Sequence, residues 1–391
     1  MIPYGKQEIT QQDIAAVAGV LNSDFLTQGP QVPNFENAIK KAVNAQHALA
    51  VNSATSALHI ACLALGVGKG DQVWTTPITF VASANCALYC GADVDFVDID
   101  NQTYNLSADK LSQKLSYAKQ NNLPLPKVVI PVHLCGQPCE MEKIHALGVE
   151  YGFAIIEDAS HAIGGKYKNR PIGNCEYSDI TVFSFHPVKI VTTAEGGVAT
   201  TNSAELAQKM DLLRSHGITR DDSLMTENSH GGWYYQQVEL GFNYRMTEMQ
   251  AALGVSQMTR LDFFVAKRNE LAVRYDEFLK GLPIITPFQI EDSYSGRHLY
   301  VIKLKLDEVT ITHKQFFEQL RKFGIGVNLH YIPVHTQPYY KKLGFKSGQF
   351  IEAENYYKQA VSIPLFHAMT DHQQQKVVRV LNDILLPKLI D

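Results

Sequence analysis

Short apolar segments alternate with amphipathic segments of ten or more residues from about residue 48 onward, and this alternation constrains the fold most strongly. The first kind of segment is typical of buried strands and the second of helices. Strands are expected at residues 48–51, 72–76, 94–99, 128–132, 154–157, 179–185 and 197–201, and helices at residues 53–65, 79–90, 108–119, 141–151 and 204–215. Such an alternation forms βαβ units. The sequence therefore predicts an α/β fold whose large domain holds a mostly parallel seven-stranded sheet with helices on both faces.

The segments before and after this alternation complete the expected architecture. Residues 11–22 and 33–44 have the pattern of short helices, and the polar, Gly-rich interval 219–232 is expected to be a mobile loop. One long helical pattern at residues 247–279 predicts a connector to a second domain. Beyond it, strands are expected at residues 298–305 and 327–331 and helices at residues 314–322, 352–359 and 372–385. We therefore expect a large domain with an N-terminal arm at residues 1–260 and a small C-terminal α+β domain at residues 261–391.

Composition excludes several classes of protein. The net charge of −4, with both signs interspersed, does not favour binding to nucleic acid or to an anionic membrane. The N-terminus has no basic segment followed by an apolar one, and no apolar run reaches the ~20 residues that cross a membrane. Six cysteines in 391 residues are too few for a disulfide framework and fit a reducing compartment. The sequence predicts a cytoplasmic protein.

Polar side chains gather where the expected strands end, which is where open parallel sheets bind ligands. Asn52-Ser-Ala-Thr-Ser56 follows a strand and opens a helix, so its N–H groups suit a phosphate, although ordinary capping by Ser53 explains the same residues. The pair Glu157 and Asp158 ends another strand. Adjacent strand residues face opposite sides of a sheet, so only one of these carboxylates can point into a cleft; the alternative is a solvated loop acid.

Lys189 lies just past the buried strand at residues 179–185, within Phe183-Ser-Phe-His-Pro-Val-Lys189. An ammonium group is costly to bury, so this lysine either extends to solvent or has a lowered pKa and forms a Schiff base. Phe80 follows a third strand, where it either packs in the core or stacks on a ring. Pyridoxal phosphate needs a Schiff-base lysine, an acid at its ring nitrogen and an anchored phosphate. Together, these groups predict a pyridoxal phosphate site.

Motifs along nearly the whole chain resemble one family of enzymes. They are Thr27-Gln-Gly-Pro30, Asn52-Ser-Ala-Thr-Ser56, Thr76-Pro-Ile-Thr-Phe80, Phe96-Val-Asp-Ile-Asp100, Val132-His-Leu-Cys-Gly-Gln137, Glu157-Asp-Ala-Ser-His161, Phe183-Ser-Phe-His-Pro-Val-Lys189, Glu195-Gly-Gly197 and Gly241-Phe-Asn-Tyr-Arg-Met246. In this order they resemble the sugar-nucleotide aminotransferases of the DegT/DnrJ/StrS family. The resemblance implies the type I fold of pyridoxal phosphate enzymes and aminotransferase activity.

The resemblance also implies roles for individual residues. Lys189 is implied as the catalytic Schiff-base lysine, Asp158 as the partner of the pyridinium nitrogen, and Phe80 as the residue stacked on the ring. The remaining implied cofactor residues are His161 near the ring oxygen, Ala54, Thr55 and Ser184 at the phosphate, and Asn243 reaching the phosphate from a second subunit. A site completed in this way implies a homodimer with shared active sites. No metal ligand is implied.

A substrate is implied by a subset of motifs, among them Arg214-Ser-His-Gly-Ile-Thr219 and His330-Tyr-Ile-Pro-Val-His335. These resemble family members of pseudaminic acid biosynthesis, which use L-glutamate to aminate C4 of UDP-2-acetamido-2,6-dideoxy-β-L-arabino-hexos-4-ulose, giving UDP-4-amino-4,6-dideoxy-N-acetyl-β-L-altrosamine. The residues implied at the sugar nucleotide are Tyr4, Asp24, Phe25, Leu26, Thr27, Asn328, Leu329, His330 and Tyr331. For Tyr4 and Asp24, an exposed loop position without function is the alternative.

Three other interpretations of the residues stay open. The chain could aminate another 3- or 4-keto sugar nucleotide, or it could bind pyridoxal phosphate as a sensor without turnover. Dehydratases of the same family carry histidine in place of the Schiff-base lysine; Lys189 argues against that class, although His186 is three residues away. The pairs Cys86/Cys90 and Cys135/Cys139 have a spacing that zinc ligands can have, but buried thiols explain it better.

Overall fold

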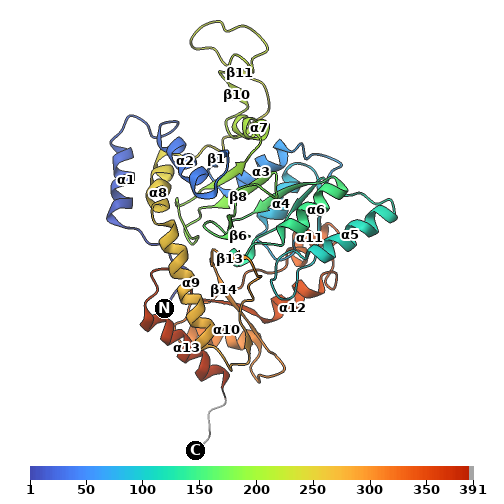
Figure 1. Ribbon diagram of the computed structural model, residues 1–391, viewed down its shortest axis with the longest axis vertical. Coiled ribbons are helices and arrows are strands. Elements are labelled where there is room, and N and C mark those ends of the chain that lie inside the picture. Colours follow the sequence, from blue (N-terminus) through green and yellow to red (C-terminus); the bar gives the residue numbers. More distant parts are fainter. Residues whose placement is uncertain (387–391) are drawn as a thin grey trace, which may run out of the picture.

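A seven-stranded sheet forms the centre of the large domain in the computed structural model, which describes residues 1–386 (Figure 1). Its strands are β1 (His47–Val51), β2 (Gln72–Thr75), β3 (Asp93–Phe96), β4 (Val128–Ile130), β5 (Ala154–Asp158), β8 (Ile180–Ser184) and β9 (Gly197–Thr201). Their order in the sheet is β1-β9-β8-β5-β4-β2-β3. Strand β9 runs antiparallel to both of its neighbours, β1 and β8, and every other neighbouring pair in the sheet is parallel. The predicted mostly parallel sheet is confirmed.

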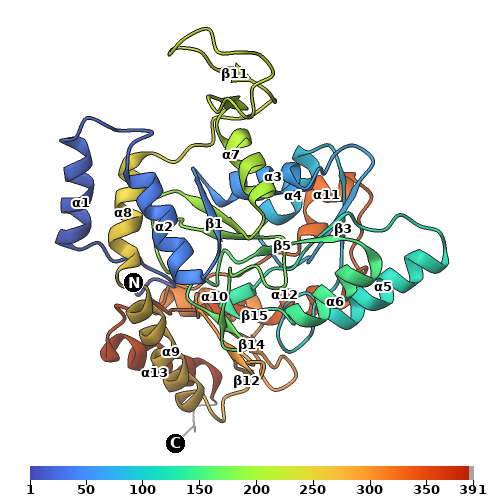
Figure 2. The same ribbon diagram turned by 45° about the horizontal axis from the view of Figure 1, so that its top comes forward.

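Helices cover both faces of this sheet, as the turned view shows (Figure 2). One face packs against α3 (Ala54–Ala64), α4 (Ala82–Tyr89) and α7 (Ala204–Arg214). The other face packs against α2 (Gln31–Val43), α5 (Ala108–Gln120), α6 (Met141–Tyr151) and α8 (Glu248–Met258). Alternate residues of β1 illustrate the division, because Leu49 and Val51 enter the first core while Ala48 and Ala50 enter the second. The sheet is therefore buried on both sides, as the βαβ pattern requires.

A separate core lies in the small domain, which packs below the large sheet in Figure 1. Its antiparallel sheet has the order β12 (Ile284–Ile285), β14 (Tyr300–Leu304), β15 (Ala360–Ile363), and its helices include α10 (His313–Lys322) and α13 (Asp371–Leu385). The expected strand at residues 327–331 is wrong: only Asn328 forms an isolated bridge, to Ser362. After it the chain leaves the sheet and turns toward the large domain, where His330 and Tyr331 line a cavity.

The expected single helix at residues 247–279 is wrong as well, because α8 ends at Met258 and α9 (Leu261–Phe278) begins after a break. At the break, Arg260 has a φ of −114° and donates to the buried carboxylate of Asp13 at 2.6 Å. The two residues are 247 positions apart in the sequence, so the helical pattern of residues 247–279 gives no sign of their contact. The first part of α9 packs in the large-domain core and its second part in the small-domain core. The boundary at residue 260 therefore stays a prediction.

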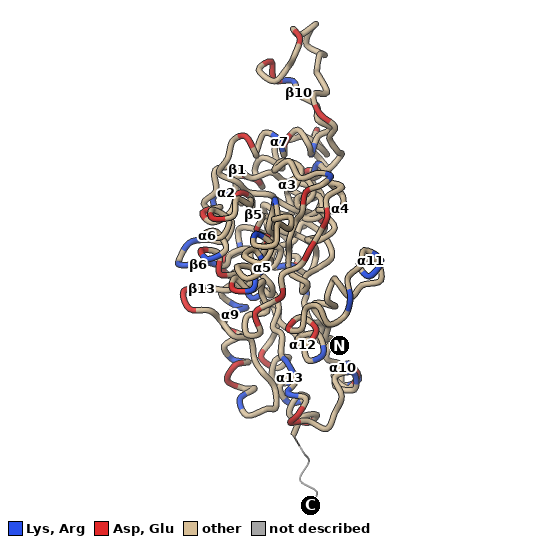
Figure 3. The backbone as a smooth tube through the Cα atoms, turned by 90° about the vertical axis from the view of Figure 1, so that its right-hand side faces the viewer, with Lys and Arg blue, Asp and Glu red and all other residues tan. Residues whose placement is uncertain are grey.

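The remaining elements lie outside the two main sheets. They are α1 (Gln11–Leu21), η1 (Leu134–Gly136), β6 (Lys166–Tyr167), β7 (Arg170–Pro171), β10 (Ile218–Thr219), β11 (Gln236–Gln237), β13 (Ser293–Tyr294), η2 (Val334–Thr336), α11 (Pro338–Lys342) and α12 (Ile351–Gln359). The pair β10 and β11 anchors a hairpin that extends away from the body, and acidic and basic residues are interspersed along the chain (Figure 3). Within residues 1–386, no helix combines the length and the apolar character needed to cross a membrane.

Arg268 of α9 holds segments of the small domain together without a carboxylate partner. Its Nη1 donates to the carbonyl groups of Arg297 (3.3 Å), His298 (3.1 Å) and Leu365 (2.9 Å), and its side chain is buried. Burial lowers the pKa of this arginine to about 10, so it remains charged at neutral pH. Buried carbonyl groups that lose their donors cost about 1–3 kcal/mol each.

Replacing Arg268 with methionine is therefore expected to lower the free energy of unfolding by about 3 kcal/mol or more. Urea denaturation followed by fluorescence measures this change. Arg379→Met, at an exposed position of α13, is the matched control and is expected to change stability by less than about 0.5 kcal/mol. Equal stability of the two variants would show that the three carbonyl contacts contribute nothing.

Candidate active site

A cavity of about 1010 Å³ opens at the carboxyl ends of the parallel strands. The sequence-predicted residues that line it are Tyr4, Ala54, Thr55, Phe80, Asp158, His161, Ser184, Lys189, Asn328, Leu329, His330 and Tyr331. These residues come from the N-terminal arm, from four segments of the large domain and from the small domain. The fold therefore gathers most of the predicted site at one place.

Lys189 lies in the turn that follows β8. The turn is fixed by backbone bonds, since Lys189 N donates to His186 O and Phe185 N donates to Gly196 O, both at 2.9 Å. The side chain is half-buried, and this burial lowers the pKa of Lys189 to about 8, although the charges of Asp158 and Cys135 act in the opposite direction. The amine is consequently a far better nucleophile at neutral pH than an ordinary lysine. This environment favours the Schiff-base interpretation over a lysine extended to solvent.

Asp158 ends β5, the strand beside β8, and is the only one of the two adjacent acids that lines the cavity. Its carboxylate accepts from Ser83 Oγ at 2.6 Å and from Ser160 N at 3.1 Å. Glu157 faces the opposite side of the sheet, where it bonds to His133 Nε2 at 2.6 Å. One strand therefore delivers a carboxylate to the cavity and a second carboxylate to a buried structural pair.

The N-terminus of α3 supplies an anion site beside Ser184. Ser53 caps this helix by accepting from Ser56 N at 3.1 Å, so the capping interpretation holds. The first amides of a helix have no partners within the helix, and Ala54 and Thr55 occupy these positions at the cavity wall. The capping role and the phosphate role are thus compatible, because the capped helix keeps N–H groups and the positive end of its dipole directed at the cavity.

Gly197 of β9 permits this arrangement. A Cβ atom added to Gly197 would lie 2.5 Å from Ala54 N and 2.5 Å from the carbonyl carbon of Ser53. Gly197 thus lets the strand lie against the start of α3, whereas a Cβ atom on Gly196 would meet the side chains of Thr193 and Met246, and together these contacts account for the motif Glu195-Gly-Gly. Gly197→Ala is expected to push the helix start aside and to weaken cofactor binding by on the order of ten-fold. Fluorescence titration of the cofactor-free variant with pyridoxal phosphate measures the affinity, with Gly68→Ala, where an added Cβ has open space, as control. Unchanged affinity would argue against a role of this contact.

Three histidines and a tyrosine, His161, His298, His330 and Tyr331, form another part of the cavity wall. His161 Nδ1 accepts from Cys135 N at 3.2 Å, so the ring hydrogen is on Nε2, which lies 3.2 Å from Tyr331 Oη. Burial lowers the pKa values of His161 and His298 well below the usual range, and burial together with the charge of Lys189 lowers the pKa of His330 to about 3. These imidazoles are therefore neutral at physiological pH, and they add no cationic charge beside Lys189.

Several residues that line the cavity or contact its carboxylate were not predicted from the sequence. His298 packs against His161 with ring centroids 4.4 Å apart and ring planes tilted by 50°, and its Nδ1 has no hydrogen-bond partner in the described chain. His186 and Glu195 line the mouth, with His186 Nε2 and Glu195 Oε1 4.0 Å apart, and Gln250 of α8 also lines the cavity. Ser83 is four residues past Thr79, with which it also exchanges a hydrogen bond at 2.7 Å. The helical spacing of Thr79 and Ser83 is the only sequence signal that could have indicated one of these residues.

The other predicted residues do not line the cavity of this single chain. Asn243 is exposed, and its carbonyl accepts from Asn52 Nδ2 at 3.4 Å. Asp24, Phe25, Leu26 and Thr27 are exposed between α1 and α2, where Leu26 O accepts from Glu248 N at 3.1 Å. Their assignments stay predictions. The cysteines flagged as metal ligands are free thiols, and Cys86 and Cys139 donate to backbone carbonyls.

The pKa of Lys189 predicts how its amine reacts in the cofactor-free protein. Only the neutral amine is nucleophilic, so labelling of Lys189 by acetic anhydride is expected to rise with pH around a midpoint near 8. The carboxylate of Asp158 raises the pKa of Lys189, and Asp158→Asn is therefore expected to move the midpoint to lower pH. Quantitative mass spectrometry of the Lys189 peptide measures both curves. A midpoint near 10.5, the ordinary lysine value, would contradict the desolvated site.

The cavity fits pyridoxal phosphate on structural grounds. It combines a desolvated lysine, a carboxylate on the neighbouring strand and the amide end of a helix, and it is large enough for the cofactor and a substrate. Phe80 lies at its mouth with 58% of its surface exposed, so its ring is free to cover a ligand. Fold and site together define a pyridoxal phosphate-dependent aminotransferase with the type I fold.

The chain belongs to the DegT/DnrJ/EryC1/StrS aminotransferase family, whose model matches residues 7–382. It is 39% identical over 386 residues to UDP-4-amino-4,6-dideoxy-N-acetyl-beta-L-altrosamine transaminase of Campylobacter jejuni, covering 98% of both chains. It is 38% identical over 387 residues to spore coat polysaccharide biosynthesis protein SpsC of Bacillus subtilis, covering 98% of this chain and 97% of SpsC. Among solved structures, it is similar to Helicobacter pylori PseC, an aminotransferase involved in the biosynthesis of pseudoaminic acid, with a TM-score of 0.89, 32% identity and coverage of 98% and 99% of the two chains.

Proposed function

We propose that this enzyme transfers the amino group of L-glutamate to C4 of UDP-2-acetamido-2,6-dideoxy-β-L-arabino-hexos-4-ulose. The product is then UDP-4-amino-4,6-dideoxy-N-acetyl-β-L-altrosamine, an intermediate on the way to pseudaminic acid. The similarity over almost the full length to a transaminase named for this product is the observation that supports the substrate most directly. The cavity with Lys189 and Asp158 supports the chemistry.

The residues of the cavity have distinct roles in this proposal. When bound, pyridoxal phosphate supplies an electron sink that stabilises negative charge on a substrate carbon. The carboxylate of Asp158 holds a proton on the ring nitrogen, and Ser83 and Ser160 keep that carboxylate oriented. Nζ of Lys189 takes a proton from the substrate carbon and later returns one, as general base and acid, for which a pKa of about 8 is well placed.

The neutral histidines and Tyr331 that line the cavity have a separate role. His161 and Tyr331 are joined through a hydrogen bond at 3.2 Å, and Tyr331 is held between the domains. Tyr4 of the N-terminal arm packs against His330 with ring centroids 5.2 Å apart. This wall narrows the cavity beside the amine and restricts water there, which protects a reactive intermediate from hydrolysis. The same wall is where we place the sugar nucleotide, together with Asn328 and Leu329.

An amino-transfer assay with glutamate tests the substrate. The panel contains the proposed UDP-4-keto sugar, its dTDP analogue, the D-configured 4-keto sugar and a 3-keto sugar nucleotide. The proposal expects turnover of the first compound to exceed that of the others by at least about ten-fold in kcat/KM. A preference for a D-sugar or a 3-keto sugar would reject this substrate and keep the aminotransferase. A protein that binds pyridoxal phosphate but converts no member of the panel would support the sensor alternative.

We also propose a homodimer in which each subunit completes the site of the other. The hairpin at β10 and β11 projects from the body (Figure 1). Trp233 within it (74% exposed) and Leu240 just after β11 (77% exposed) present apolar surface that a second subunit can cover. Asn243 follows this hairpin and is exposed in the single chain. Its predicted phosphate contact therefore requires a partner subunit, as do any contacts of residues 24–27 with the cavity.

Subunit mixing tests the shared site. Lys189→Ala and Asn243→Ala homodimers are expected to be inactive or weak alone. If Asn243 acts across the interface, exchange of subunits creates hybrid dimers with one intact site, and activity reappears. Sedimentation equilibrium measures the dimer itself. A monomer, or mixtures without recovery, would contradict the proposal. We further propose a cytoplasmic location, supported by six cysteines that are all free thiols in the described chain.

A further inference from the structure

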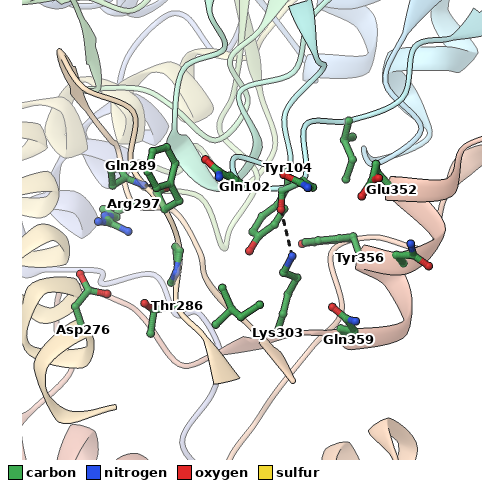
Figure 4. A pocket seen from close by; sticks show the side chains of 16 residues that line it. Gln102, Tyr104, Asp276, Thr286, Gln289, Arg297, Lys303, Glu352, Tyr356 and Gln359 are labelled. Carbon is green, nitrogen blue, oxygen red and sulfur yellow. Dashed lines mark hydrogen bonds between the residues drawn. The ribbon is translucent and has the colours of Figure 1, made fainter. Parts of the chain in front are cut away.

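A second cavity, of about 990 Å³, lies between the two domains and shares no lining residue with the active-site cavity (Figure 4). Its walls come from the loop after β3, the end of α9, the segment after β12, strand β14 and helix α12. The charged residues among its lining are Asp276, Arg297, Lys303 and Glu352. The chemistry assigned above uses none of them, so the cavity needs an explanation of its own.

Arg297 is the group that points to a ligand. It is only 6% exposed, and its Nε has no acceptor anywhere in residues 1–386. The carboxylate of Asp276 influences it without forming an ion pair in the described chain, and one oxygen of Asp276 accepts from Tyr300 Oη. A buried guanidinium without partners is costly, and a bound carboxylate is the group that matches its planar donors best.

The remaining charges define the class of ligand. Lys303 Nζ donates to Asn101 O at 3.2 Å and lies 4.6 Å from the centre of the Tyr104 ring. With Glu352 on the facing helix, the lining carries two cationic and two anionic side chains. A simple anion at Arg297 would be repelled by Asp276, whereas a molecule with adjacent carboxylate and ammonium groups satisfies both. The apolar part of the lining, which includes Ile285, Pro287 and Phe288, suits an apolar side chain.

We propose that this cavity is a binding site for an apolar α-amino acid, with its carboxylate on Arg297 and its ammonium group on Asp276. The site is connected to the active-site cavity by two short links. Arg297 is followed directly by His298, which lines the active-site cavity, and Tyr356 Oη donates to the carbonyl of His330 at 2.7 Å. A ligand that orders Arg297 and Tyr356 therefore also orders two walls of the active-site cavity, which makes it an effector of the enzyme.

Calorimetry of the holoenzyme with L-leucine, L-methionine and L-phenylalanine tests the site. Each is compared with its analogue lacking the amino group, such as 4-methylpentanoate for leucine, and with its amide. At least one amino acid is expected to bind, more tightly than either analogue by on the order of ten-fold, because each analogue loses one charged contact. No 2-oxo acid is expected to form from the bound amino acid, which separates this site from the active-site cavity, where an amino donor is converted. Absence of binding by all three amino acids, or release of the 2-oxo acid in step with binding, would overturn the proposal.

Two variants test whether the amino acid binds at Arg297 and Asp276. Arg297→Gln is expected to weaken amino acid binding by on the order of ten-fold to a hundred-fold, while Arg379→Gln on exposed α13 leaves it unchanged. Asp276→Asn keeps an acceptor for Tyr300 Oη and removes the charge, so it remains informative even if Arg297→Gln does not fold. This variant is expected to bind leucine and 4-methylpentanoate equally. Retained preference for leucine in Asp276→Asn, or unchanged binding in a folded Arg297→Gln, would overturn the proposal.

Discussion

Lys189→Arg is expected to abolish amino transfer, with a loss in kcat of at least about 10⁴-fold. Arginine keeps the positive charge but is not deprotonated in proteins, so it can neither form a Schiff base nor accept a proton. In the proposed mechanism the wild-type amine does both, from a half-buried position where burial lowers its pKa to about 8. Turnover of glutamate with a 4-keto sugar nucleotide measures the loss, and the absorbance of the bound cofactor reports the missing covalent bond.

The controls for this variant separate chemistry from folding. Lys69→Arg changes an exposed lysine in the turn before β2 and is expected to keep wild-type turnover. Thermal melting of cofactor-free Lys189→Arg is expected to stay close to that of the wild type, because no hydrogen bond of the described chain is lost with the side-chain amine. A Lys189→Arg enzyme with near wild-type turnover and an intact Schiff-base spectrum would contradict the assignment.

Asp158→Asn is expected to lower kcat by on the order of 10²–10³-fold without a matching loss of stability. The amide keeps an acceptor for Ser83 Oγ and Ser160 N, so the local hydrogen bonds are preserved. It cannot hold a proton on the ring nitrogen, so the cofactor becomes a weaker electron sink. Single-turnover kinetics with glutamate are expected to show the loss in the chemical step rather than in substrate binding.

The neighbouring acid provides a matched contrast. Glu157 is buried on the other face of β5, bonded to His133 and to the hydroxyl groups of Ser178 and Thr181. Glu157→Gln is expected to cost about 1–3 kcal/mol of stability, because it removes a buried carboxylate that is hydrogen-bonded to three side chains, and to leave the chemical step within a few-fold of wild type. If Glu157→Gln slowed the chemistry as much as Asp158→Asn, the division of roles between the two faces would be wrong.

The parts of the fold that could be predicted are those that follow from the local periodicity of apolar residues in the sequence. The alternation from residue 48 onward located the strands of the large sheet, and the polar residues at their ends located the cavity. Adjacent residues of a strand face opposite sides, and this rule limited the choice to one of Glu157 and Asp158 before any contact was known. The choice of Asp158 and the roles of single residues came from the family resemblance.

The parts that could not be predicted depend on contacts between distant residues. The break between α8 and α9 is fixed where Arg260 meets Asp13, and nothing in the helical pattern of 247–279 marks it. Ser83 reaches Asp158 across 75 residues, and His298 packs against His161 from the other domain. Segment 327–331 has the apolar pattern of a strand, but its last residues leave the small sheet to line the cavity.

Transfer of nitrogen from ¹⁵N-glutamate to the UDP-4-keto sugar tests the central claim most directly. NMR of the product is expected to show one ¹⁵N atom at C4 of the sugar for each 2-oxoglutarate released, with wild-type holoenzyme and not with Lys189→Arg. The coupling constants of the ring protons are expected to fit the L-altro configuration. Release of 2-oxoglutarate without ¹⁵N in any sugar nucleotide, or equal transfer by Lys189→Arg, would contradict the account.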